Sequence, residues 1–148
     1  MGELPIAVYV KPPARGDLVV DALDQWKAFT GITYTLVTDP NQEPLLRVIE
    51  EEFEGASGQF GVDAFYPNRR IRLATVVVRP GRVNKKLFRH ELGHALGFFR
   101  HPDFSGVMGV CSTCRDEVTP REGAMLANLY AIAHGARLET DGSWRVIR

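Results

Sequence analysis

The spacing of apolar residues along the chain changes between the two-residue period of strands and the wider period of helices. Five runs rich in β-branched and aromatic residues, bounded by turn-forming residues, predict strands at residues 6–10, 33–38, 45–49, 59–66 and 71–79. The last run contains Val76, Val77 and Val78, and such a continuous apolar segment is typical of an interior strand. Strand and helix signals therefore alternate over the first two-thirds of the chain.

Two helices are predicted among these strands. The first covers residues 17–29 and is followed by Gly31, a residue type that often ends helices. Its apolar stripe is predicted to comprise Leu18, Ala22, Trp26 and Phe29. The second helix begins after Asn84, a suitable N-cap, and runs to Leu96 or Gly97.

The last third of the chain is mostly irregular. Residues 98–118 lack periodicity, so we expect an ordered functional loop or a loop held by a metal ion. Thr119 can cap a final helix, because Glu122 three residues later completes a capping box. This helix is predicted to extend to about residue 134, and residues 136–148 to form a short hairpin.

The composition excludes several classes of protein. The chain has 148 residues, which fits one domain, residues 1–148, and its 45% hydrophobic content is enough for one core. Its formal net charge is zero, so we expect neither nucleic acid nor an acidic membrane surface as a partner. No apolar run approaches the length of a transmembrane helix, and the N-terminus lacks a signal-peptide pattern. The compartment stays open, and a secreted or extracytoplasmic location is our expectation.

The central motif is His90-Glu91-Leu92-Gly93-His94, within the second predicted helix. Residues four apart lie on one face, about 6 Å apart along the axis, so both imidazoles can bind one zinc ion. Glu91 is rotated about 100° from His90 and can lie beside a zinc-bound water without being a ligand. Zinc lowers the pKa of that water from about 15.7 toward about 7, so Glu91 is predicted to be the general base.

A third ligand must come from outside the helix. Gly97 lies three residues after His94 and can end the helix with a positive φ, so the chain can turn back and deliver His101. Three histidines leave a fourth position open for water and substrate, as catalytic zinc requires.

The run from His90 to His101, followed by Gly106-Val107-Met108, resembles the metzincin clan of zinc peptidases. That clan has the pattern H-E-x-x-H-x-x-G-x-x-H and then a methionine-containing turn (Met-turn) beneath the metal. The resemblance implies an α+β fold: a twisted, mixed five-stranded sheet with a backing helix, an active-site helix, the Met-turn and a C-terminal helix. It covers most of residues 6–134, but only residues 90–108 are specific.

One departure from the clan pattern concerns the third ligand. Three residues separate Gly97 from His101, where the clan has two, and the clan position falls on Arg100, which cannot lose its proton to bind zinc. A turn longer by one residue can still bring His101 to the metal. Otherwise Asp103 is the ligand, since an aspartate replaces the third histidine in some small clan members.

The resemblance assigns two further features. Met108 would form the apolar floor beneath the histidines, although a plain core methionine fits equally well. Residues 61–66, with Ala64 and Phe65 at their centre, would bind the substrate backbone by strand addition, unless they form an ordinary interior strand. No tyrosine follows soon after Met108, so the branches that use one to stabilise the oxyanion are not matched.

Cys111 and Cys114 are the only cysteines, and three interpretations stay open. They can form a local disulfide that holds the specificity loop, half of a second zinc site, or two free thiols.

These features predict a zinc-dependent endopeptidase, a monomer that acts on peptide or protein substrates. A non-catalytic zinc-binding module that kept the fold is the alternative, and intact Glu91 speaks against it. A third interpretation takes Glu122 from the last helix as the third ligand, but it would leave His101 and Met108 unexplained.

Overall fold

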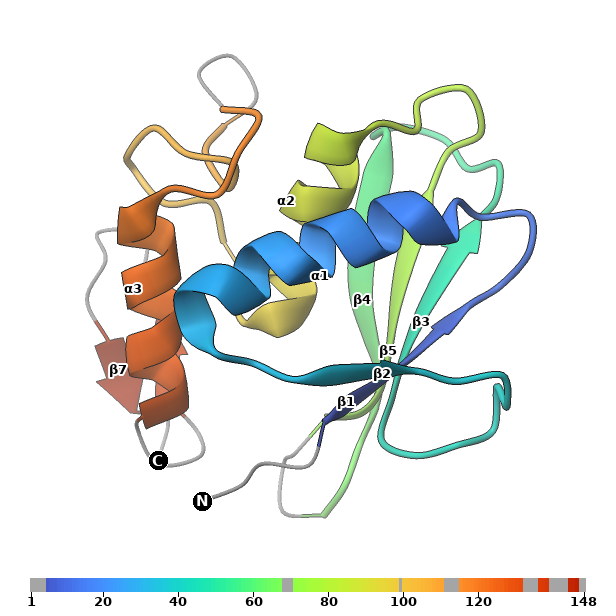
Figure 1. The fold of residues 1–148 in the computed structure, drawn as a ribbon, viewed down its shortest axis with the longest axis horizontal. Coiled ribbons are helices and arrows are strands. Elements are labelled where there is room, and N and C mark those ends of the chain that lie inside the picture. The colour runs from blue at the N-terminus through green and yellow to red at the C-terminus, as the bar shows by residue number, and fades with distance from the viewer. Residues whose placement is uncertain are drawn as a thin grey trace.

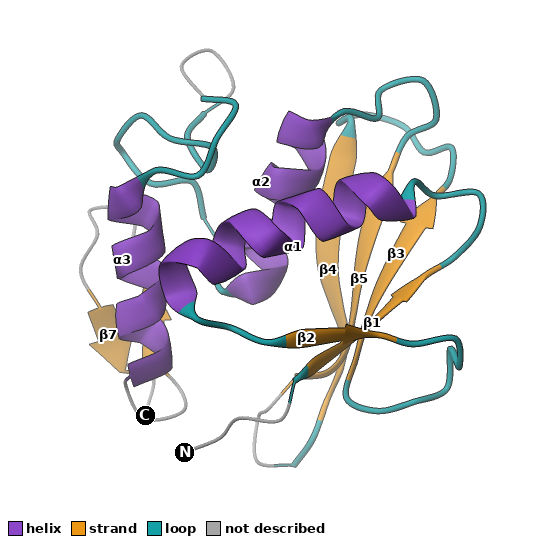
Figure 2. Ribbon diagram, in the orientation of Figure 1, coloured by secondary structure: helices purple, strands orange, loops and turns teal. Residues whose placement is uncertain are grey.

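A five-stranded mixed sheet forms one layer of the fold, with the helices to one side of it (Figures 1 and 2). The computed structural model describes residues 5–67, 71–98, 100–110, 115–131, 136–138 and 144–146. The strand order is β2-β1-β3-β5-β4, with β4 antiparallel to β5 and the other neighbours parallel. The strands are β1 (Ile6–Val10), β2 (Tyr34–Leu36), β3 (Leu45–Glu50), β4 (Gly58–Phe65) and β5 (Ile71–Val78). The predicted mixed sheet is thus confirmed.

The positions of β5 and β4 in the sheet decide which backbone is open to a ligand. β5 lies between β3 and β4, as its continuous apolar run predicts. β4 is an edge strand, which pairs with β5 alone among the described strands. Its pairing with β5 shifts register between Val62 and Phe65, where the strand bulges. The Gly58 end of β4 is regularly paired and lies beside the start of α2 (Lys85–Leu96).

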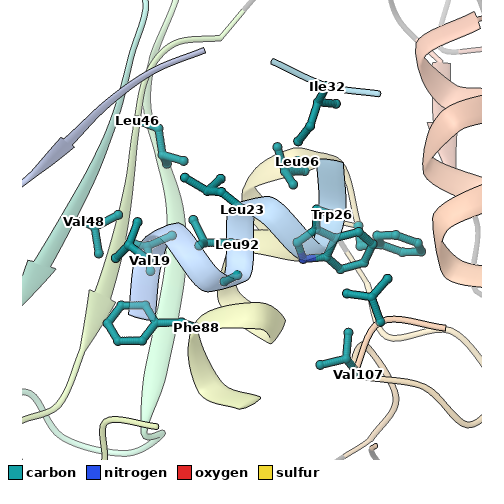
Figure 3. Packing of buried hydrophobic residues seen from close by; sticks show 14 of the residues in the cluster. Val19, Leu23, Trp26, Ile32, Leu46, Val48, Phe88, Leu92, Leu96 and Val107 are labelled. Atoms are coloured by element: carbon teal, nitrogen blue, oxygen red, sulfur yellow. The ribbon is translucent and has the colours of Figure 1, made fainter. Parts of the chain in front are cut away.

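Helix α1 (Gly16–Thr30) and helix α2 pack against each other over one face of the sheet, and the core lies beneath them (Figures 1 and 3). Side chains that alternate along β3 and β5 point into this core, because successive residues of a strand face opposite sides. The strand residues buried there include Val8, Leu46, Val48, Ala74, Val76 and Val78.

The buried stripe of α1 differs from the predicted one. Its fully buried side chains are those of Val19, Ala22, Leu23 and Trp26. Leu18 is partly buried and packs against the core, as predicted, whereas Phe29 is 40% exposed, so its predicted place in the stripe was wrong. Phe29 instead covers Gly123 of α3 (Pro120–Ala131), where any side chain would overlap it. Contact with a third helix, which periodicity cannot reveal, draws Phe29 away from the sheet.

The C-terminal elements follow the sequence signals. Thr119 donates its backbone N–H and its hydroxyl to Glu122 Oε2, at 2.8 and 2.9 Å, and accepts the Glu122 N–H, which confirms the capping box. The described part of the helix ends at Ala131, and residues 132–135 lie outside the described residues. The hairpin is confirmed by β6 (Ala136–Leu138), which pairs antiparallel with β7 (Trp144–Val146). No helix among the described residues has both the length and the apolar character needed to cross a bilayer.

Candidate metal centre

Two imidazoles project from consecutive turns of α2. Asn84 caps this helix by accepting the backbone N–H of Leu87 at 2.8 Å, which sets the register of the turns that follow. His90 is buried and His94 is partly buried, and their Nε2 atoms are 3.1 Å apart. The four-residue spacing thus places both rings at one point, as the motif predicts.

His101 joins the pair from outside the helix. Gly97 ends α2 with φ 143°, a conformation that disfavours any side chain, and the chain turns back there. His101 Nε2 comes within 3.0 Å of His90 Nε2, although the turn is one residue longer than the clan pattern. His90, His94 and His101 form the metal-compatible group found among the described residues, and their ligand atoms lie within 4.8 Å of one another.

The hydrogen bonds of the two helix histidines decide which nitrogen carries the proton. His90 Nδ1 is 2.7 Å from the Val107 carbonyl oxygen, and His94 Nδ1 bonds the Phe98 carbonyl oxygen. A carbonyl only accepts, so each Nδ1 is the donor and each Nε2 presents a lone pair. Two lone pairs 3.1 Å apart repel each other unless a cation lies between them. Burial lowers the pKa of both rings, that of His94 to about 4, so an added proton does not relieve this repulsion near neutral pH.

This donor set fits zinc. Nitrogens that bind one zinc ion at about 2.0–2.1 Å in tetrahedral geometry are about 3.3–3.4 Å apart. The Nε2 separations of 3.0 and 3.1 Å are close to that value. The Nδ1–H bonds to backbone carbonyls are the outer contacts that orient histidine ligands at metal sites. A metal ion would therefore replace an unfavourable contact with three favourable ones.

Glu91 lines the same cleft as the three histidines. It is 5% exposed, and this burial raises its pKa to about 7. A Cβ on Gly58 would lie 2.7 Å from Glu91 Oε1, so only a glycine at the start of β4 leaves room for this carboxyl. The result is a poorly solvated carboxyl group whose proton affinity suits exchange near neutral pH.

Met108 packs directly on the backbone of α2. Its side chain is fully buried, and a Cβ on Gly93 would overlap its sulfur and crowd Trp26. Gly93 lies between the two helix histidines in sequence, so Met108 supports the helix at the level of the metal centre. The packing explains why the motif carries a glycine here.

A buried carboxylate holds the turn that contains Met108. Glu122 has no exposed surface, and its Oε1 accepts the Met108 N–H at 2.7 Å. The carbonyl of the same peptide unit, that of Val107, accepts His90 Nδ1–H. One peptide plane thus links Glu122 to His90. The capping box was visible in the sequence, but this second role of Glu122 was not, because no local pattern relates residues 108 and 122.

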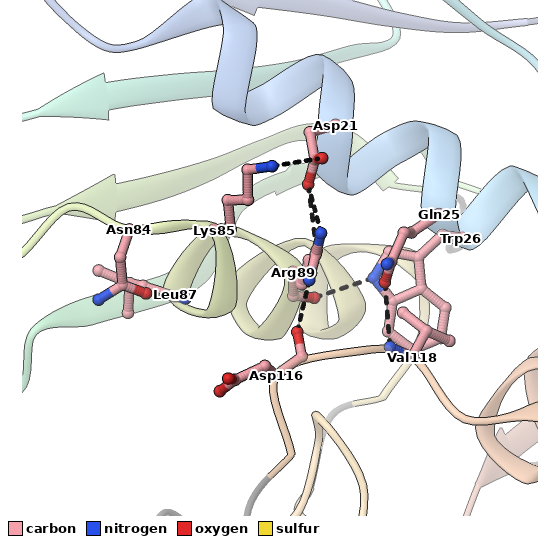
Figure 4. A network of polar contacts seen from close by, with 9 residues as sticks. All are labelled: Asp21, Gln25, Trp26, Asn84, Lys85, Leu87, Arg89, Asp116 and Val118. Carbon is pink, nitrogen blue, oxygen red and sulfur yellow. Dashed lines mark hydrogen bonds and ion pairs between the residues drawn. The ribbon is translucent and has the colours of Figure 1, made fainter.

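A second network, around Arg89, fixes the back of the helix (Figure 4). Arg89 donates to Asp21 Oδ2 at 2.8 and 3.1 Å and to the Asp116 carbonyl at 2.7 Å. Its own carbonyl accepts the Trp26 Nε1–H at 2.9 Å. Arg89 thereby connects α1, α2 and the segment that leads to α3. Sequence reasoning missed it, since nothing distinguishes it from a surface arginine.

Of the other predicted site residues, those that the structure describes are not grouped with the three histidines. Asp103 is exposed and is not a member of the metal-compatible group, and the carboxylate of Glu122 is engaged with Met108 and Thr119. Ala64 and Phe65 lie at the bulged end of β4, outside the described lining of the cleft. Cys111 and Cys114 lie outside the described residues.

The three histidines open into a cleft of about 740 Å³, a volume typical of ligand-binding sites. One wall is the start of β4 with the residues before it, and the other is formed by α2 and the loop that precedes it. The strand side is formed by Ala56, Ser57, Gly58, Gln59 and Phe60, which sequence reasoning did not single out. No protein-family model matches the chain, and a search of curated proteins finds no match for it.

Proposed function

We propose that the chain is a zinc-dependent endopeptidase with a metzincin-like fold and that it forms one catalytic domain. The observation that carries the proposal is the convergence of three Nε2 atoms, two of which have their Nδ1 protons bound to backbone carbonyls. These three rings form a group of described residues that could hold one metal ion together. A buried carboxyl in the same cleft adds the second element that hydrolysis requires.

His90, His94 and His101 would hold the zinc ion, which supplies a Lewis acid for the scissile carbonyl and makes water more acidic. Glu91 takes a proton from the attacking water and returns it to the leaving amine. Its low exposure supports this role, because a desolvated carboxyl with a raised pKa can bind and release a proton near neutral pH. His90 is kept in its ligand orientation by the Val107 carbonyl.

The edge strand supports peptides as substrates. Among the described strands β4 pairs with β5 alone, so an extended peptide can add to its other edge as a sixth strand. Addition along a strand engages residues on both sides of the cut, which suits an endopeptidase that acts within a chain. The cleft wall from Gly58 to Phe60 is the part of β4 that supports this role best.

The test combines metal analysis with mapping of cleaved peptides by mass spectrometry. The protein is expected to hold one equivalent of zinc and to cut within peptides of a mixed library. Phenanthroline should abolish cutting, and added zinc should restore it. A zinc-loaded protein that cuts neither casein nor the library would overturn the proposal and favour a non-catalytic zinc module.

A further inference from the structure

Two basic side chains line one end of the cleft. Arg82 lies in the loop 79–84 that joins β5 to α2, and Lys86 lies in the first turn of α2. Glu91 is the single acidic residue in the described lining, so the two basic side chains outnumber it. This end of the cleft therefore carries a net positive charge.

The basic residues at the start of α2 stand where a helix is stabilised by acidic ones. The N-terminus of a helix carries a partial positive charge and is stabilised by acidic residues in its first turn. The first turn of α2 has no acidic residue and begins Lys85-Lys86 instead. Lys85 is directed to Asp21 on α1 (Figure 4), whereas Lys86 lines the cleft. The field of the helix end thus adds to that of Arg82 and Lys86.

Lys86 takes part in an ion pair, and Arg82 is exposed. Lys86 Nζ lies 3.5 Å from Asp116 Oδ1, but the Asp116 side chain is 83% exposed, and ion pairs of this kind contribute little. Arg82 is exposed and has no ion pair with a described residue. Both side chains line the cleft, so a carboxylate that enters it can approach both of them.

The direction of a bound peptide decides on which side of the cut such a carboxylate lies. The first residues of β4 adjoin the loop that carries Arg82, since the Arg79 N–H bonds the Ser57 carbonyl at 2.9 Å. A peptide that adds antiparallel to β4 ends toward this loop, and antiparallel pairing is the slightly more stable kind. Its residues after the cut bond would then approach Arg82 and Lys86.

We propose that the cleft selects peptides with an acidic side chain on the C-terminal side of the cut bond, recognised by Arg82 and Lys86. The inference rests on the proposed peptidase function and specifies its substrate class. Because Arg82 is exposed and Lys86 is only partly buried, the preference for glutamate over lysine is expected to be roughly fivefold to tenfold in kcat/KM.

The experiment uses zinc-loaded protein and quenched fluorogenic peptides that carry Glu, Gln or Lys at each of the three positions after the cut. Glu peptides should be cut fastest, and the ratio of Glu to Gln rates should shrink when salt rises from about 0.05 to about 0.5 M. The variant Arg82→Gln/Lys86→Gln should bring that ratio toward one, and Arg82→Glu/Lys86→Glu should favour Lys peptides. Lys85→Gln, the same change one residue away and outside the cleft lining, should keep the ratio of the parent protein.

Peptide binding separates this inference from the proposed function. Glu91→Gln protein loaded with zinc is titrated with labelled Glu and Lys peptides, and fluorescence anisotropy gives the two affinities. Tighter binding of the Glu peptide, lost in the Arg82→Gln/Lys86→Gln background, supports the inference even if the parent protein cuts nothing. Equal affinities, cleavage that is blind to charge, or an acidic preference before the cut would overturn it, while cleavage itself would leave the peptidase function standing.

Discussion

Replacing Glu122 by glutamine tests the link between the last helix and the metal centre. Glu122 accepts the Met108 N–H with one oxygen and the Thr119 N–H and hydroxyl with the other. Glutamine has one oxygen and one NH₂ group, so at least one buried N–H donor must face another donor. Hydrogen bonds to a charged group contribute about 1.5–3 kcal/mol each, and one or two are lost, so the metal-free protein should lose about 2–4 kcal/mol.

The assay is urea unfolding of the metal-free protein followed by competitive zinc titration. With a slope near 2 kcal/mol per molar urea, the expected loss lowers the unfolding midpoint by about 1–2 M. Because the Val107–Met108 peptide also orients His90, zinc affinity should fall about tenfold, the lower end of the effect of outer-shell partners.

Thr119→Ala is the matched control. It removes the hydroxyl of the capping box but keeps the bond between Glu122 and the Met108 N–H. It should cost about 1 kcal/mol, as other N-cap losses do, and leave zinc affinity within about twofold. If Glu122→Gln bound zinc as tightly as the parent protein, the peptide unit would not transmit position from Glu122 to His90, and the reasoning would be refuted.

Four further predictions concern the proposed third ligand, Glu91 and the contact between Gly93 and Met108. His101→Ala should bind far less than one equivalent of zinc after dialysis, whereas Asp103→Ala should keep it, since only His101 shares the ligand group; full zinc in His101→Ala contradicts the assignment. Glu91→Gln should retain zinc but lose about 10²–10⁴-fold in kcat/KM, measured with a fluorogenic peptide. The same change should stabilise the metal-free protein at pH 8 by about 2–3 kcal/mol. Burial raises the pKa of Glu91 from 4.5 to about 7, so its contribution to stability is complete below pH 4.5 and is lost as the pH rises through 7. If the parent protein and Glu91→Gln had equal urea midpoints at pH 8, the burial of the Glu91 carboxyl would be contradicted. Gly93→Ala should cost about 1–3 kcal/mol through overlap with the Met108 sulfur, and Gly61→Ala, where a Cβ meets nothing within 4 Å, should not; thermal unfolding compares the two.

Local signals in the sequence determined the parts of the site that lie on one element. His90 and His94 lie close together because four residues make about one helical turn, and this contact does not depend on the rest of the chain. Asn84 begins the helix, Gly97 ends it, and Thr119 with Glu122 begins the last one, through bonds that span three or four residues. Such contacts depend on neighbours in the chain, which is why the motif, the caps and most strands could be predicted.

Only the tertiary structure decided how distant segments meet. The apolar residues of α1 are compatible with several buried stripes. The packing of α2, α3 and the sheet places Val19 and Leu23 in the core, while Phe29 contacts Gly123 instead. The position of β4 at the edge of the sheet likewise depends on which strands pair, and the residue pattern of a strand does not predict its neighbours.

The same reason applies to the site as a whole. His101 reaches His90 across a turn of unusual length, Glu122 reaches Met108 across fourteen residues, and Arg82 reaches the cleft because β5 ends beside the start of β4. Many residues of the sequence could make such contacts, and no spacing distinguishes those that do. The sequence alone determined the chemistry of the helix motif, whereas long-range packing decided what surrounds it.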